Sequence, residues 1–218
     1  MTIAGVRVDI DREGVVVRAA GPLTTVSSGV VGGGLGRASA IVNVHAAKNF
    51  LGEHVDRVLA EFVARRSIQA PWVGLLTGAS TEKAEVAVEK IDGTTAMAIV
   101  TVGLSHPASA GRSAVAAWLP STINTILVVD AAAAPGALVN LVMTVTEAKV
   151  MALAEAGVRT PDGDPASGTS TDAIVVAATD GGRRFDFGGP VSELGWAAAR
   201  AAKSALSAGI VRWLREHS

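Results

Sequence analysis

The chain has 218 residues, of which 49% are hydrophobic and 18% charged, so it is long and apolar enough to bury one sizeable core. Its 19 basic and 20 acidic residues nearly balance, which argues against a nucleic-acid partner because such proteins carry a basic surface. The absence of cysteine excludes disulfides, thiolate metal sites and a cysteine nucleophile. Charged Arg7 and Asp9 stand where a secretory signal needs an apolar run, so we expect a cytoplasmic protein that does not enter a membrane.

The first part of the chain predicts strands joined by turns, followed by a helix. Strands are expected at residues 6–10, 15–18, 24–31 and 40–45. The first two alternate in polarity around a polar turn, which predicts a β-hairpin, and a glycine-rich run separates the last two. Apolar residues at helical spacing predict a helix over residues 50–66.

The rest of the chain predicts further strands and two long helices. Strands are expected at residues 71–76, 85–91, 96–102, 123–129 and 173–178. The β-branched run at 123–129 is typical of a strand buried on both faces. Pro135 near its first turn and Gly157 at its end bound a helix over residues 135–156, and a last helix is expected over 191–214.

These elements predict a mixed α/β fold over residues 1–218, a single layered domain with a mixed sheet of about eight strands flanked by three or four helices. Three polar residues, Asn43, Asn124 and Asp172, lie in or just before buried strands that lead toward helices. Internal duplication of a strand–helix unit and a strand–helix pattern common to many proteins both explain this repeated arrangement, and the sequence leaves the choice open.

Four short segments in the second half form an ordered pattern. They are Ser-Thr-Ile-Asn at residues 121–124, Gly-Ala-Leu-Val at 136–139, Thr-Glu-Ala-Lys at 146–149 and Gly-Thr-Ser-Thr-Asp at 168–172. In this order and spacing they resemble the adenosylcobinamide amidohydrolase family. Residues 27–28, 32–35, 73–77 and 100–105 are similar to the family's earlier segments, so the resemblance runs from about residue 24 to residue 206.

The resemblance implies a hydrolase that cuts the amide joining the cobyric acid core of adenosylcobinamide to its aminopropanol arm. The product, adenosylcobyric acid, then re-enters cobalamin synthesis. The implied partner is a small-molecule corrinoid, with cobalt present only as part of that substrate and no cofactor held by the protein. The oligomeric state stays open.

Two other functions stay open beside this amidohydrolase. His106 and Pro107 stand where the family tends to have Asn-Ala, Arg112 stands where an acid is common, and Ser121 stands where glycine is expected. These departures fit a non-catalytic corrinoid-binding protein of the same fold. A hydrolase of the same fold that acts on a different amide is the third hypothesis.

Glu147 and Lys149 are candidate catalytic residues on the helix over residues 135–156. They are about 200° apart around a regular helix, so they cannot both face one site. Lys149 shares its face with Val142 and Val145, and it is either a base in apolar surroundings or a stem that covers apolar surface. Glu147 is either a general acid or base or a solvated side chain, and we favour it slightly over Lys149.

The segment at residues 168–172 places hydroxyls and a carboxylate before a buried strand. Amide hydrolysis needs a nucleophile or activated water, an oxyanion stabiliser and an acid for the leaving amine. Thr169 or Ser170 is the candidate nucleophile, and Asp172 would orient a base. Asn124 is the candidate oxyanion donor and Asn43 a weaker one, although Thr and Asp also cap turns for purely structural reasons.

Other residues are candidates for substrate binding. Ser27 and Ser28 precede Gly33 and Gly34 in an open loop where the backbone can approach a ligand closely. The remaining substrate-binding candidates are Thr77, Thr101, His106, Thr146 and Thr171. The four histidines lack metal-binding spacing, so we expect no catalytic metal.

Overall fold

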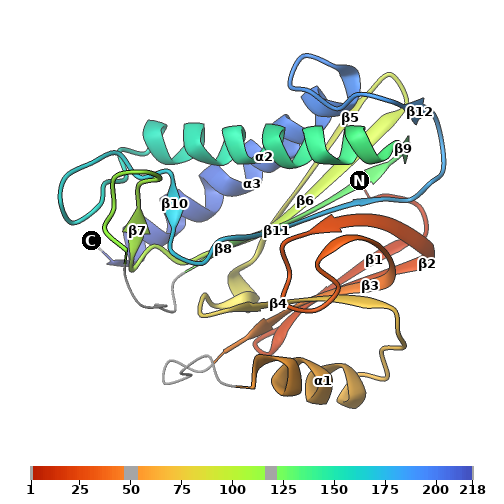
Figure 1. Ribbon diagram of the computed structural model, residues 1–218, viewed down its shortest axis with the longest axis horizontal. Coiled ribbons are helices and arrows are strands. Elements are labelled where there is room, and N and C mark those ends of the chain that lie inside the picture. The colour runs from red at the N-terminus through yellow and green to blue at the C-terminus, as the bar shows by residue number, and fades with distance from the viewer. Residues whose placement is uncertain (1, 47–53, 116–121, 218) are drawn as a thin grey trace.

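The computed structural model describes residues 2–46, 54–115 and 122–217 (Figure 1). Its long strands are β1 (Val6–Ile10), β2 (Gly14–Ser27), β3 (Gly34–His45), β4 (Trp72–Thr77), β5 (Glu85–Ile91), β6 (Thr94–Val102), β8 (Ile123–Asp130) and β11 (Ala173–Ala178). Its short strands are β7 (Pro107–Ala108), β9 (Ala132–Ala133), β10 (Gly168–Thr169) and β12 (Arg184–Phe185). The helices are α1 (Val55–Arg65), α2 (Pro135–Glu155) and α3 (Glu193–His217), with the 3₁₀ turn η1 over Thr81–Lys83.

The long strands form one eight-stranded sheet in the order β4-β3-β2-β11-β8-β6-β5, with β1 paired to β2. β3 is parallel to β4 and β8 is parallel to β11, while the other pairs are antiparallel. Each parallel pair has a helix between its strands in the sequence, because a parallel connection must cross back over the sheet. The predicted mixed α/β fold is confirmed.

The sheet bends so that its two halves pack against each other. Ile41 of β3 and Leu75 of β4 share one apolar core with Ile99 of β6 and Ile126 of β8. Helices α2 and α3 cover the other side of β6, β8 and β11, and α1 covers the outer side of β3 (Figure 1). Strand β8 lies between two cores, and this explains why its first seven residues are all buried.

Three strand predictions in the first part of the chain are wrong, and the last helix spans Glu193–His217 where 191–214 was expected. The separate strands expected at 15–18 and 24–31 form one strand, β2, whose pairing with β3 shifts register between Arg18 and Leu23. That strand ends at Ser27 and not at residue 31, and beyond it Val31 makes only an isolated bridge to Gly74. Strand β3 begins at Gly34, inside the expected glycine loop. The start of the helix predicted from residue 50 falls at 47–53, outside the described residues, and α1 is described from Val55.

Within the described ranges, α2 is the helix whose length and mean hydropathy, 1.5 over its most apolar window, would suit a membrane span. However, 44% of that window is buried, and Leu138, Leu141 and Val145 pack into the core beneath the helix. A helix packed in a core meets the same criteria. The apolar residues of α2 are therefore explained by its packing against the sheet and α3.

Candidate functional site

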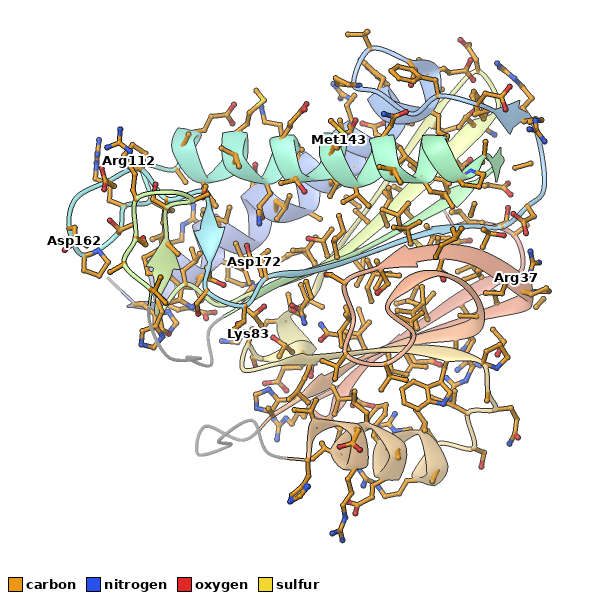
Figure 2. The ribbon with its side chains drawn as sticks, in the orientation of Figure 1. Arg37, Lys83, Arg112, Met143, Asp162 and Asp172 are labelled. Carbon is orange, nitrogen blue, oxygen red and sulfur yellow. The ribbon has the colours of Figure 1, made fainter. Side chains whose placement is uncertain are left out.

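A partly buried ion pair lies at the end of the sheet where β8 and β11 begin. Lys149 extends from α2 toward the turn before β11, and its Nζ donates a hydrogen bond to Asp172 Oδ2 at 2.5 Å. Figure 2 shows Asp172 beneath α2. The two side chains are 16% and 15% exposed, so the pair is largely shielded from solvent but remains open on one side.

Asp172 accepts three further hydrogen bonds. Thr169 Oγ1 donates to its Oδ1 at 2.5 Å and the Thr169 N–H donates to its Oδ2 at 3.2 Å. The N–H of Ile123, the first residue of β8, donates to Oδ1 at 2.9 Å. The carboxylate therefore joins an ammonium group and a hydroxyl in one fixed arrangement, with backbone amides preventing rotation.

A pocket of about 130 Å³ lies beside the ion pair. Its walls come from α2, β8, β11 and the residue before β11: Ile123, Thr125, Val145, Thr146, Lys149, Asp172, Ala173 and Ile174. The two charged side chains and two threonines supply the polar part of its lining, and four aliphatic side chains supply the rest. Such a pocket suits a small group with an apolar body and one polar end.

Gly168 allows the ion pair to approach the backbone. A Cβ on this residue would lie 2.9 Å from Lys149 Nζ and still closer to Asp172 Oδ2. We expect Gly168→Ala to separate the two charged groups and to lower kcat on the order of 10²-fold, because catalytic groups tolerate little displacement. Steady-state hydrolysis measures this, with Gly136→Ala as the control since a Cβ there meets nothing within 4 Å. A fully active Gly168→Ala enzyme would contradict the prediction.

Asn43 and Asn124 form a buried polar network between the two halves of the sheet. Asn43 Nδ2 donates to Thr101 Oγ1 at 3.0 Å, while Asn124 Nδ2 donates to Asn43 Oδ1 at 2.8 Å and to the Leu76 carbonyl at 2.9 Å. The three polar side chains are 1–2% exposed. Both amide protons of Asn124 are used, so in this conformation it has no donor to offer an oxyanion. The network instead joins β3, β4, β6 and β8 at the end of the sheet that carries the ion pair.

Thr122 is absent from the predicted site residues, yet it connects this network to the turn before β11. Its Oγ1 lies 2.7 Å from Asn124 Oδ1 and 2.8 Å from the Thr171 carbonyl, and its single proton is shared between these two acceptors. The residue is 3% exposed. Thr122 lies two residues before Asn124 in the family-like segment 121–124, which could have marked it as a site residue. The sequence alone does not show that its hydroxyl faces Thr171.

Thr122→Val is expected to lower kcat about tenfold and the melting temperature by a few degrees. The variant keeps the shape but removes the proton that Asn124 Oδ1 and the Thr171 carbonyl share, and an unsatisfied buried acceptor costs about 1–3 kcal/mol. Thr122→Ser should restore both properties because it keeps the hydroxyl. Activity and thermal unfolding measured on both variants test this, and equal damage by serine and valine would contradict it.

The two charged residues of the predicted helix lie on different sides of α2. Glu147 is exposed on the outer face, near Met143 and Met151, which are 55% and 53% exposed. Lys149 faces the sheet, which confirms that the two residues do not share one site on this regular helix. The structure places Lys149, and not the favoured Glu147, at the pocket. Thr146 lines the pocket, and its Oγ1 donates to the Val142 carbonyl at 2.7 Å.

Ser27 and Ser28 make hydrogen bonds to backbone groups near the pocket. Ser28 N donates to the Ile174 carbonyl at 2.9 Å, and its Oγ accepts from Ile174 N at 3.0 Å, which extends the pairing of β2 with β11. Ser27 Oγ accepts from Gly29 N at 2.8 Å and the residue is 7% exposed. The Ser28 hydroxyl thus supports the start of β11, which forms one wall of the pocket, whereas the Ser27 hydroxyl stabilises the turn after β2.

The other predicted binding residues are more scattered. Gly33 and Gly34 are exposed, and Gly34 has a φ of +84°, a conformation that other residues adopt only with strain. Thr77 is 1% exposed and accepts from Ala79 N at 3.0 Å, so it stabilises a turn after β4. None of these three lines the pocket.

Short strands bring the His106 segment beside residues 168–169, which lie just before the turn that carries Asp172. β7 pairs with β10, with Pro107 opposite Thr169. His106 and Ser170 are exposed and Thr171 is partly exposed, so all three lie at the surface around the ion pair. Of the residues that depart from the family pattern, Arg112 makes an ion pair with Asp164 at 2.6 Å, and Ser121 lies outside the described residues.

In the described part of the chain, no three His, Asp or Glu side chains lie close enough together to hold a metal ion. His45 Nδ1 is 2.9 Å from the Ala79 carbonyl, and His217 stacks on Trp213 at the end of α3. The expectation that the reaction uses no resident metal or cofactor stays a prediction.

The family model for adenosylcobinamide amidohydrolase matches residues 2–218. The chain belongs to this family. The adenosylcobinamide amidohydrolase of Methanosarcina mazei is 29% identical over 199 residues, which cover 87% of this chain and 91% of that relative. Among solved structures, the amidohydrolase is similar to the PH0078 protein of Pyrococcus horikoshii OT3, with 15% identity, a TM-score of 0.49 and coverage of 97% and 83% of the two chains. A Burkholderia sp. beta-aminopeptidase matches with 14% identity, a TM-score of 0.47 and coverage of 98% and 92%.

Family membership confirms the resemblance on which the predicted activity rests. The protein is an enzyme of the amidohydrolase class, and its family indicates hydrolysis of adenosylcobinamide. Nothing in these comparisons favours the non-catalytic corrinoid-binding alternative. They leave the roles of individual residues open, and those roles have to be inferred from the geometry.

Proposed function

We propose that this amidohydrolase cleaves the amide between the cobyric acid core and the aminopropanol arm of adenosylcobinamide, and that Thr169, Asp172 and Lys149 carry the reaction. The strongest support for these three residues is the set of hydrogen bonds that Asp172 accepts. A single carboxylate accepts a hydrogen bond from a threonine hydroxyl on one oxygen and from a lysine ammonium on the other, beside a pocket.

Each of the three groups has a distinct role. Thr169 Oγ1 attacks the amide carbon while its proton passes to Asp172, which already accepts that hydrogen bond at 2.5 Å. The carbonyl oxygen becomes an oxyanion, which the Lys149 ammonium stabilises by its charge. When the tetrahedral intermediate collapses, the C–N bond breaks and the aminopropanol nitrogen takes the proton from Asp172.

The resulting ester between Thr169 and the corrinoid is then hydrolysed. Water attacks the ester carbon and gives its proton to Asp172, which returns it to Thr169 Oγ1 as the C–O bond breaks. The products are adenosylcobyric acid and aminopropanol, and the enzyme returns to its starting state. Asp172 thus transfers a proton in both halves of the reaction.

The decisive experiment combines product analysis with intact-protein mass. Purified enzyme is incubated with adenosylcobinamide, with and without a metal chelator, and the products are separated by chromatography. We expect adenosylcobyric acid and aminopropanol in both samples, and a protein adduct of the acyl mass when the reaction is quenched early. Absence of product in both samples would refute the activity. If product forms without any adduct and the Thr169→Ala variant is as active as the wild-type enzyme, Thr169 is not the nucleophile, although the proposed activity still holds.

The remaining proposals concern the setting of the reaction. We infer that the enzyme works in the cytoplasm, where proteins without disulfides are the rule, because the sequence contains no cysteine. We further infer that no cofactor is required, because the proposed steps use only side chains of this chain and water. Equal activity before and after dialysis against a chelator is the expected result for the second proposal.

A further inference from the structure

The pocket beside Lys149 and Asp172 is too small for the whole substrate. Its volume is about 130 Å³, whereas pockets that enclose drug-sized ligands measure roughly 300–1,000 Å³, and a corrin macrocycle is larger than such ligands. If the proposed function is right, only a side-chain segment near the scissile amide fits inside. The macrocycle must then rest on the protein surface next to the pocket.

An apolar strip leads from the pocket across the neighbouring strands. It begins at Ile174 of β11, which lines the pocket and is partly exposed. Ile174 and Val26 of β2 both pack against the core under α2, so they lie on the same face of the sheet. Leu35 of β3 is paired directly with Val26, and paired residues of antiparallel strands share a face. Leu35 is 61% exposed, although it stands in the sheet.

The strip has dimensions and surroundings that suit a flat apolar ligand. From β11 to β3 it crosses two strand spacings, roughly 10 Å in all. Val142 of α2 also packs against the same core and remains partly exposed, about one helical turn before the pocket-lining Val145. Exposed aliphatic side chains on a sheet face that continues into a pocket are typical of ligand-binding surfaces.

We propose that the strip Leu35–Val26–Ile174 is the docking surface for the corrin macrocycle, and that it orients the aminopropanol arm toward Thr169, Asp172 and Lys149. This inference rests on the proposed function, because it takes the substrate to be a corrinoid. The apolar face and peripheral methyl groups of the macrocycle cover Leu35 and Val26. Ile174 marks the point where the ligand passes from the strip into the pocket.

The test is Leu35→Ser, which removes exposed apolar surface without touching the core. If Leu35 is buried against the macrocycle, the variant should have a KM for adenosylcobinamide that is raised on the order of tenfold. Its kcat should be unchanged, because the lost contact is the same in the ground and transition states. Adenosylcobyric acid keeps the macrocycle but lacks the arm, so its Kd in equilibrium dialysis should rise by a similar factor. Val211→Ser, which alters a valine 41% exposed on α3, is the control and should change neither value.

The possible outcomes separate this inference from the proposed function. An unchanged KM and Kd in Leu35→Ser would overturn the docking surface even if the wild-type enzyme hydrolyses adenosylcobinamide. A fall in kcat at constant KM would also overturn it, since docking would then not be what Leu35 provides. If the wild-type enzyme forms no product, the dialysis measurement still reports whether the strip binds a macrocycle. A second variant, Val26→Thr, keeps the β-branched shape of a strand residue and should weaken binding in the same direction.

Discussion

Asp172→Asn is expected to lower kcat for adenosylcobinamide hydrolysis by about 10²- to 10⁴-fold, the usual contribution of a positioned proton-transfer group. The asparagine has nearly the same shape, but it cannot accept a proton from Thr169. It also replaces one oxygen that now accepts from Lys149 or Thr169 with an amide group that donates. KM should change much less than kcat, because the interaction acts in the transition state.

Initial rates at several substrate concentrations measure this effect. Asp162→Asn is the matched control, since Asp162 is an exposed aspartate in the loop before β10 and is labelled in Figure 2. Circular dichroism and thermal unfolding should show that both variants fold. If Asp172→Asn keeps more than half of the wild-type kcat, Asp172 does not transfer a proton and the proposed roles are wrong.

Lys149→Met is expected to lower kcat by about 10²- to 10³-fold, as removal of a group that stabilises an oxyanion does in other hydrolases. Methionine keeps most of the aliphatic length and removes the ammonium. The Asp172 carboxylate, only 15% exposed, then loses its cation, so we also expect a lower melting temperature. Both effects follow from the same ion pair, and activity and thermal unfolding should be measured on the same preparation.

Two controls distinguish the site from general effects of charge removal. Lys203→Met breaks an exposed ion pair with Glu155, 40% and 54% exposed, which should contribute little to stability or rate. Glu147→Gln changes a charge two residues from Lys149 on the opposite face of α2 and should leave kcat near the wild-type value. Loss of activity in Glu147→Gln with an active Lys149→Met would instead place the chemistry on the outer face of the helix.

The secondary structure was largely predictable because its signals are local. Alternation in polarity located β5 and a short apolar run located β11 at their observed bounds, and Pro135 and Gly157 marked the ends of α2 to within a residue. Boundaries failed where the bent sheet overrides local preference. Strand β2 continues through Gly21 and Pro22 because β1, β3 and β11 pair along it, and no local pattern reveals those partners.

By itself the sequence determined the family, through the order of its short segments, and the angular separation of Glu147 and Lys149, which follows from helix geometry alone. Only the tertiary structure decided which of the two faces the pocket. That depends on which side of α2 packs on β8 and β11, and on a turn 23 residues further along the chain that presents Asp172 to Lys149. It also decided that Asn43, Thr101 and Asn124 meet in one network, because strands distant in sequence come together only when the sheet bends back on itself.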